Sequence, residues 1–141
     1  METAAELSDL SVLVVEPDRQ TREALFVYFR IHGYAASTAG NAAEAQAAMR
    51  RQSFDLIVAE YRLPDEDGVS VLRSSGERQE GAIRILTTAY SCNACRIRGD
   101  LTGIDEIVRK PFTGDELLDR IERHTFGRIA RIAEPVMPLH P

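Results

Sequence analysis

The stretch that decides the fold is FDLIVAEYRLPDEDG, residues 54–68. It contains a short apolar run, Leu56 to Ala59, of the kind that forms a buried strand. The run ends on Glu60 and leads into a loop with Pro64 and Gly68, which are residues typical of turns. A carboxylate is therefore expected at the end of a strand, where Glu60 is either a solvated terminator or part of a reactive site.

The same succession of a strand and a helix is predicted at four further places along the chain. Short apolar or β-rich runs predict strands, while helical spacing of apolar residues, helix caps and stop residues predict helices. The predicted strands lie at residues 12–15, 35–38, 55–59, 83–87 and 106–108. The predicted helices cover residues 19–32, the segment after Asn41, residues 69–77, the region near 91–100 and the segment after Thr113.

The first predicted helix has a clear apolar pattern and a stop signal. Gly33 is expected to end it, because glycine adopts the left-handed conformation that commonly closes helices. Two later helices begin with the spacing of a capping box, Asn41 with Glu44 and Thr113 with Glu116. The positions of the first helix that are expected to face the core are Ala24, Leu25, Tyr28, Phe29 and either Ile31 or His32.

Alternating strands and helices predict an α/β fold with a parallel sheet and helices on both faces. The strands lack polar alternation, which fits burial on both faces. In such folds the ligand crevice lies at the carboxyl ends of the strands. The residues at those ends are Glu16-Pro17-Asp18, Glu60, Thr88-Ala89 and Lys110-Pro111. Acidic groups, a hydroxyl and a lysine are therefore expected to converge on one side of the sheet.

Composition and charge exclude several classes of function. The 141 residues fit one domain, and the hydrophobic fraction of 44% is sufficient for a core without disulfides or a structural metal. A net charge of −5 gives no basic face for nucleic acid. No apolar stretch is long enough to cross a bilayer, and METAAELSDL is unlike an export signal, so we expect a cytoplasmic protein.

Several elements stand in a specific order and spacing along the chain. They are VLVVEPD, Arg22, GYAASTAGNAAEA, FDLIVAEYRLPDEDG, ILTTA, GIDEIVRKPF and ELLDRIER. Together they resemble the receiver domains of two-component response regulators, from about Val12 to Phe126. The resemblance implies a doubly wound, flavodoxin-like sheet of five parallel strands in the order 2-1-3-4-5.

The resemblance also implies roles for residues at the strand ends. In receiver domains an acidic pair and an aspartate hold Mg²⁺, the aspartate accepts a phosphoryl group, and a hydroxyl and a lysine bind that group. The acidic pair falls on Glu16 and Pro17, the phosphoacceptor position on Glu60, the hydroxyl on Thr88 and the lysine on Lys110.

Two of these positions depart from the family pattern in ways that affect phosphorylation. Pro17 has no side-chain oxygen, so the position of a metal ligand is lost. Glu60 has one methylene more than aspartate, which moves its carboxylate outward by about 1.5 Å. A displacement of that size costs on the order of a hundredfold in reactions that depend on alignment. We therefore expect weak or absent Mg²⁺ binding and no efficient phosphorylation.

A third departure concerns the switch residue. Receivers typically carry Tyr or Phe three residues before the lysine, where this chain has Ile107. An aliphatic side chain cannot provide the usual movement of an aromatic ring. Clustered carboxylates without a metal ion repel one another. We therefore expect Lys110 and Arg62 to supply the positive charge that balances them.

The function expected from the sequence is a stand-alone, atypical receiver that acts through protein contacts and is not an enzyme. The receiver is expected to span residues 1–126, with a C-terminal helical extension or tail at 127–141 and no output domain. Expected partners are a histidine kinase, a phosphotransfer protein or an effector, with a homodimer also possible. The expected contact face consists of the helix near 91–100, the strand at 106–108 and the helix after Thr113.

Alternatives remain open at three places. Glu60 is either a fixed mimic of the phosphorylated state, an inert residue or a residual phosphoacceptor. Cys92 and Cys95 form a Cys-x-x-Cys pair, so a redox-sensing α/β protein is the alternative from another class. The tail is either a frayed helix end or a segment that docks on a partner through Ile129, Ile132 and Val136.

Overall fold

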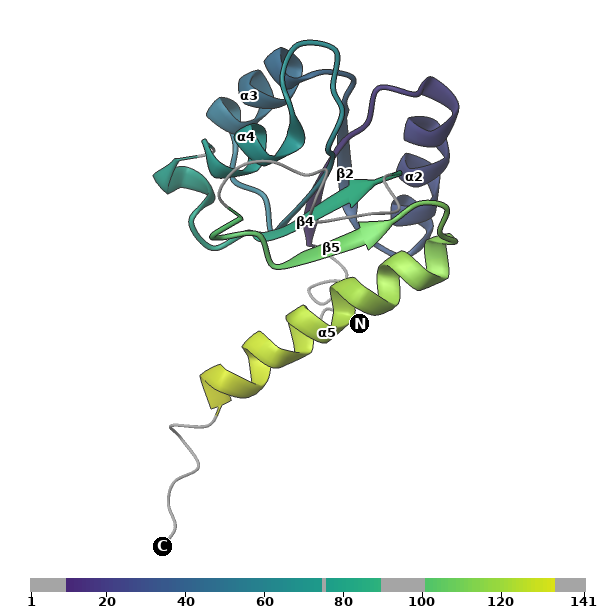
Figure 1. Cartoon of the computed structure of the whole chain (residues 1–141). Coiled ribbons are helices and arrows are strands. Elements are labelled where there is room, and N and C mark those ends of the chain that lie inside the picture. Colours follow the sequence, from purple (N-terminus) through teal and green to yellow (C-terminus); the bar gives the residue numbers. More distant parts are fainter. Residues whose placement is uncertain (1–9, 75, 90–100, 134–141) are drawn as a thin grey trace, which may run out of the picture.

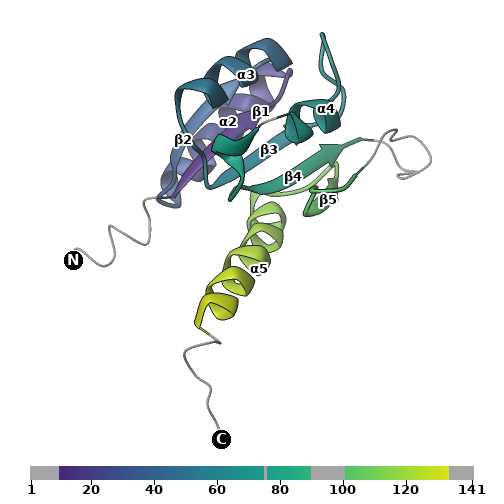
Figure 2. The ribbon, with the colours of Figure 1, turned by 90° about the vertical axis from the view of Figure 1, so that its left-hand side faces the viewer.

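Five short parallel strands form one sheet in the order β2-β1-β3-β4-β5 (Figures 1 and 2). The computed structural model describes residues 10–74, 76–89 and 101–133. This topology confirms the predicted fold class, and strand labels follow Figure 1. The strands are β1 (Ser11–Val15), β2 (Ala35–Ala39), β3 (Leu56–Glu60), β4 (Ile83–Thr88) and β5 (Glu106–Arg109).

Helices cover both faces of the sheet and divide the core into two layers. The helices described are α2 (Arg19–Ile31), α3 (Ala42–Arg51), α4 (Gly68–Arg73) and α5 (Gly114–Ala133), with a 3₁₀ turn at Glu77–Gln79. Alternate residues of β1 point to opposite layers, as the pleat of a strand requires. Val12 and Val14 pack with residues of α2 and α5, whereas Leu13 and Val15 pack with residues of α3 and α4. The two-sided burial explains why the strands are apolar throughout.

Two predictions about the helices are wrong in detail. The helix predicted at 69–77 ends at Arg73, where the N–H of Ser74 closes the helix on Ser70 and Gly76 follows with a φ of 80°. In α2 only Leu25 and Phe29 are buried, while Ala24 and Ile31, at 74%, are exposed, as is His32 just after the helix. A helix lying on a sheet buries only the narrow stripe that touches the strands.

The predicted helix near 91–100, with Cys92 and Cys95, lies outside the described residues. Within the described ranges, no helix is both long enough and apolar enough to cross a membrane.

A buried glutamine connects segments that are distant in the sequence. Gln79 is fully buried, and its amide oxygen accepts the Phe54 N–H at 2.8 Å. Its amide nitrogen donates to the carbonyl oxygens of Met49 at 3.0 Å and Gln52 at 2.7 Å. The Gln79 side chain thus hydrogen-bonds to backbone groups at the end of α3 and just before β3. These bonds fix where β3 begins.

Replacing Gln79 by Ala is expected to lower the free energy of unfolding by about 3 kcal/mol, because buried backbone groups lose their partners. Urea unfolding measures this effect. Glu80 is the exposed neighbour of Gln79, and Glu80→Ala should change stability by no more than about 0.5 kcal/mol. Equal midpoints for the two variants would contradict the structural role assigned to Gln79.

Candidate functional site

The structure brings together three of the residues that the sequence placed at strand ends. Glu16 follows β1, Glu60 ends β3 and Lys110 follows β5. The Lys110 ammonium lies 2.7 Å from Glu16 Oε1 and 2.7 Å from Glu60 Oε1. Glu16 is 3% exposed and Glu60 is 6% exposed. These residues, the Lys110 cluster, form a buried arrangement of two carboxylates around one ammonium.

The second oxygen of each carboxylate accepts a backbone N–H. Glu16 Oε2 accepts the Asp18 N–H at 2.9 Å, and Glu60 Oε2 accepts the Arg62 N–H at 3.0 Å. Glu60 Oε1 has the ammonium as its ionic partner but no hydrogen bond of regular geometry within the described part of the chain. Each glutamate is thus held from both sides, and Arg62 contacts Glu60 through its backbone.

The charge state of Lys110 follows from two opposing effects. Burial acts to lower the pKa of its ammonium, but the hydrogen bond to Glu16 and the attraction of the Glu16 and Glu60 carboxylates outweigh it. The pKa of Lys110 is therefore raised above its ordinary value, and the side chain stays charged at neutral pH. Its backbone N–H donates to the Thr88 carbonyl at 2.7 Å, which ties the start of the loop after β5 to the end of β4.

The loop after β3 folds back closely onto the strand end. A Cβ atom at Gly68 would lie 2.3 Å from the backbone oxygen of Glu60, a distance that no side chain tolerates. The Gly68 N–H donates to the Tyr61 carbonyl at 2.7 Å. Gly68 is therefore required for this close approach, because any side chain at this position would collide with the Glu60 backbone.

The acidic residues next to the Lys110 cluster are engaged by helix N-termini. Asp18 accepts the Thr21 N–H at 2.9 Å in α2, and Asp67 accepts the Ser70 N–H at 2.8 Å in α4. Asp65 accepts the N–H groups of Ala42 at 2.9 Å and Ala43 at 3.0 Å, at the start of α3. Hydrogen bonds from Thr21 lower the pKa of Asp18, and that from Ala42 lowers the pKa of Asp65. These carboxylates cap helices instead of extending the cluster.

The loop after β1 is held by an arginine. Arg22 Nη1 donates to the backbone oxygens of Glu16 at 2.8 Å and Pro17 at 3.2 Å. It also lies 3.0 Å from where a Cβ at Gly40 would be placed. Arg22 thus fixes the backbone on which Glu16 is carried.

This set of donors does not fit the Mg²⁺ ion that receiver domains hold. Mg²⁺ needs near-octahedral coordination by oxygen. Pro17 offers no side-chain oxygen, Asp18 is bound to Thr21, and an ammonium already bridges Glu16 and Glu60. The positive charge that the carboxylates need is present on Lys110 itself.

The other two predicted positions lie close by. Thr88 is the last residue of β4 and is 1% exposed, and its backbone carbonyl accepts the Lys110 N–H. Ile107 lies in β5 opposite Leu86 and packs, partly buried, against the core layer of α3 and α4. Asp65 and the capping role of Asp18 were not predicted. The partners of Asp65 belong to another element, α3. The contact of Asp18 with Thr21 depends on a turn that exists only once the loop has folded.

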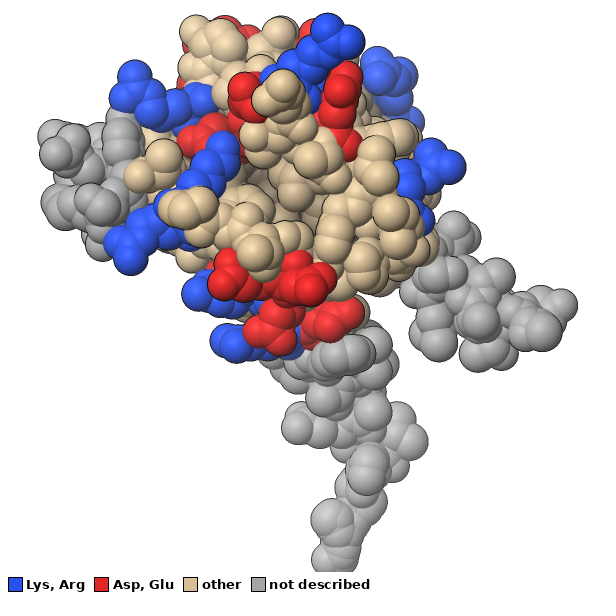
Figure 3. Space-filling model, turned by 90° about the vertical axis from the view of Figure 1, so that its right-hand side faces the viewer, with Lys and Arg blue, Asp and Glu red and all other residues tan. Residues whose placement is uncertain are grey.

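Figure 3 looks onto the side toward which β4 and β5 point in Figure 1. The middle of this side consists largely of uncharged residues, and acidic residues gather at its lower part. Glu16 and Glu60 are buried, so they do not belong to this exposed acidic group.

Comparison with known proteins gives a consistent result. The family model of the response regulator receiver domain matches residues 12–122. The chain is 36% identical over 126 residues to the TorCAD operon transcriptional regulatory protein TorR of Escherichia coli K12, covering 88% of this chain and 54% of TorR. It is 35% identical to the probable transcriptional regulatory protein TcrX of Mycobacterium tuberculosis, covering 79% of this chain and 48% of TcrX. The chain thus spans about half the length of these relatives.

Solved structures show the same fold. A CheY-like receiver domain protein from Methanospirillum hungatei superposes with a TM-score of 0.78 at 22% identity, covering 87% of this chain and 98% of that one. TrrA of Thermotoga maritima, solved in complex with Mg²⁺-BeF, gives 0.70 at 30% identity, covering 81% and 97%. With the family model matching most of its length, the chain belongs to the response regulator receiver domain family of two-component signalling.

Proposed function

We propose that this receiver is atypical and acts through protein contacts without accepting a phosphoryl group. The observation that carries the proposal is the position of the Lys110 ammonium, 2.7 Å from an oxygen of each buried glutamate. A phosphoryl donor would have to displace this ammonium and expose the Glu60 carboxylate before reaction. Both steps break charge-assisted contacts in a buried setting, which is energetically costly.

The geometry of Glu60 supports the same proposal. Its carboxylate is 6% exposed and is fixed by Lys110 on one oxygen and by the Arg62 N–H on the other. A nucleophile needs a free oxygen aligned with the incoming phosphorus. The added methylene of glutamate extends the carboxylate to Lys110, whose ammonium engages one of its oxygens.

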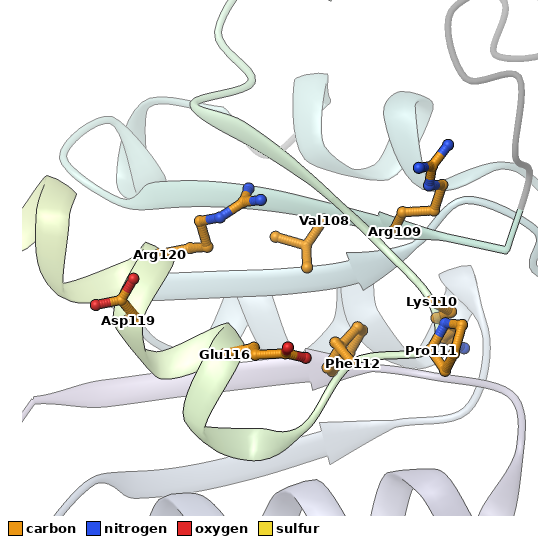
Figure 4. A pocket seen from close by; sticks show the side chains of 8 residues that line it. All are labelled: Val108, Arg109, Lys110, Pro111, Phe112, Glu116, Asp119 and Arg120. Carbon is orange, nitrogen blue, oxygen red and sulfur yellow. The ribbon is translucent and has the colours of Figure 1, made fainter.

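The surface between β5 and α5 is the contact face that we propose. A hollow of about 440 Å³ lies there, with Arg109 and Arg120 extending on one side and Glu116 and Phe112 on the other (Figure 4). Lys110 lines this hollow as well as the cluster. A partner bound at the hollow would therefore contact Lys110, and its affinity would depend on the ion pairs of Lys110 with Glu16 and Glu60. A histidine kinase, a phosphotransfer protein or an effector is the partner class that we propose.

Two variants of this proposal differ in what Glu60 does. Glu60 held by Lys110 either imitates the phosphorylated state or only fills the position. As a mimic, the Glu60 carboxylate carries one negative charge, whereas a phosphorylated aspartate carries nearly two. Glu60→Gln removes that charge while keeping the shape, so a loss of partner affinity in this variant would favour the mimic. Phosphorylation of Glu60 is the competing candidate, and an added phosphoryl mass on the wild-type protein would support it.

Millimolar Mg²⁺ is expected to leave the thermal stability of the protein unchanged, because Lys110 occupies the place of the cation. A magnesium site filled at a hundred times its Kd would add about 2.7 kcal/mol. Calorimetry with and without Mg²⁺ measures the difference, with Ca²⁺ as a control for general ionic effects. A rise with Mg²⁺ alone would contradict the proposal.

A further inference from the structure

The outer edge of β2 presents backbone groups that the described sheet does not use. β2 is the end strand of the sheet, as Figure 2 shows, and pairs with β1 alone. The Ala35 N–H donates to Leu10, and the Ala39 carbonyl accepts from Glu16. Alternate residues of a strand direct their backbone groups to opposite sides. The N–H and C=O groups of Ala36 and Thr38 therefore point outward and have no hydrogen-bond partner among the described residues.

The two edges of the sheet differ in how they are protected. At the opposite edge β5 begins with Glu106, which is bound to Arg120 and His124, and Pro111 follows the strand closely. Charges and prolines of this kind discourage pairing with another chain. The sequence of β2, AASTA, contains neither a charge nor a proline. Its edge is therefore open to a further strand.

A shallow hollow of about 520 Å³ lies beside the first half of β2. It is lined by residues of α2 and β2, by the turn that connects them and by Gln52, which follows α3; Arg30 and Ala36 are among these residues. A strand added antiparallel to β2 and centred on Ser37 would run its later residues past this hollow. The hollow gives room for the residues that follow Thr38 in such a strand.

Charge distribution favours a second copy of this chain as that strand. Along α3, which packs on β2, Glu44 lies in the first turn and Arg50 and Arg51 lie in the last turn. Arg30 stands at the same end of the molecule as the last turn of α3, beside the hollow. A two-fold axis at Ser37 brings the acidic end of each copy to the basic end of the other. Opposite charges then face each other on both sides of the axis.

We propose that two copies pair through their β2 edges, in antiparallel orientation, to form one continuous sheet. Ala36 lies opposite Thr38 of the second copy, and each such pair exchanges both backbone hydrogen bonds. Ser37 of both copies meets at the axis. The contact is isologous and closes after two copies, so it does not lead to fibres. The pairing uses no residue of the Lys110 cluster and does not depend on the function proposed above.

Sedimentation velocity from micromolar to several hundred micromolar protein tests this contact. The wild-type chain is expected to form a dimer, and Thr38→Pro is expected to weaken it roughly thirtyfold, because the outward N–H is lost in both copies. Proline is tolerated at an edge position whose N–H faces away from the sheet. Thr38→Val keeps the N–H and should dimerise like the wild type.

Two results would overturn the proposal. One is a wild-type chain that stays monomeric throughout the concentration range. The other is a dimer that persists unchanged in Thr38→Pro, which would place the contact elsewhere. Circular dichroism verifies that the variant is folded. If Thr38→Pro unfolds, Thr38→Lys replaces it, because a charge at the centre of the pairing also prevents association.

Discussion

Replacing Lys110 by Met is expected to lower the free energy of unfolding by about 3 kcal/mol at neutral pH, because two buried carboxylates lose their cation. Lys110 has 25% of its side chain exposed, so the loss lies at the lower end of the range for buried pairs. Denaturant unfolding at neutral pH measures the loss.

Two control variants distinguish this effect from a general loss of charge. Arg19→Met breaks an exposed pair with Glu23, whose side chains are 81% and 63% exposed, and should cost less than about 1 kcal/mol. Lys110→Met combined with Glu16→Gln and Glu60→Gln removes all three charges and should recover most of the stability. A Lys110→Met protein as stable as the wild type would contradict the role given to the cluster.

The wild-type protein offers a second way to observe the same contact. Lys110 is the only lysine in the chain, so selective labelling gives a single side-chain ammonium signal in NMR. Its pKa should lie above the ordinary value of 10.5. The stabilisation by the ion pairs is then complete below about pH 10.5 and is lost as the pH rises through the folded value. A midpoint below 10.5 would contradict the pairing.

The variant with Pro17→Asp and Glu60→Asp together is expected to gain Mg²⁺-dependent phosphorylation, by at least about a hundredfold over the wild type. The first change supplies the missing carboxylate ligand beside Glu16. The second shortens the side chain by about 1.5 Å, which withdraws the carboxylate from Lys110 and releases the ammonium to bind a phosphoryl group. Incorporation from a small phosphodonor, followed by mass spectrometry, measures the gain.

The single variants are the controls for this gain. Glu60→Asp alone lacks the ligand at position 17, and Pro17→Asp alone keeps the long acceptor, so each should remain far less reactive than the double variant. This non-additivity is expected for groups that act as one unit. A double variant as unreactive as the wild type would show that the reaction is blocked by something other than these two residues.

The sequence predicted the fold and the meeting of Glu16, Glu60 and Lys110, because strand periodicity and the rule for parallel sheets place strand ends on one side. It also predicted that Lys110 and Arg62 would both balance the carboxylates, and the structure shows ion pairs of Lys110 with both glutamates. It did not predict that Arg62 would contribute its backbone N–H to Glu60, since the direction of a loop amide depends on the folded turn.

Contacts between distant segments were the part that the sequence could not supply. Gln79 reaches Phe54 across 25 positions, and Asp65 reaches Ala42 across 23 positions. A helix cap contributed by another element leaves no local pattern, unlike the spacing of Asn41 and Glu44. The burial of Ile31 was also predicted incorrectly, and Ile31 is exposed. Helical spacing alone does not say which turn of a helix extends past the sheet.

Intact mass after incubation with acetyl phosphate and Mg²⁺ shows whether Glu60 accepts a phosphoryl group. The wild-type mass is expected to stay unchanged, while the Pro17→Asp, Glu60→Asp variant gains one phosphoryl group under the same conditions. A wild-type protein that gains a phosphoryl group, and loses this ability in Glu60→Gln, would show that Glu60 is a phosphoacceptor.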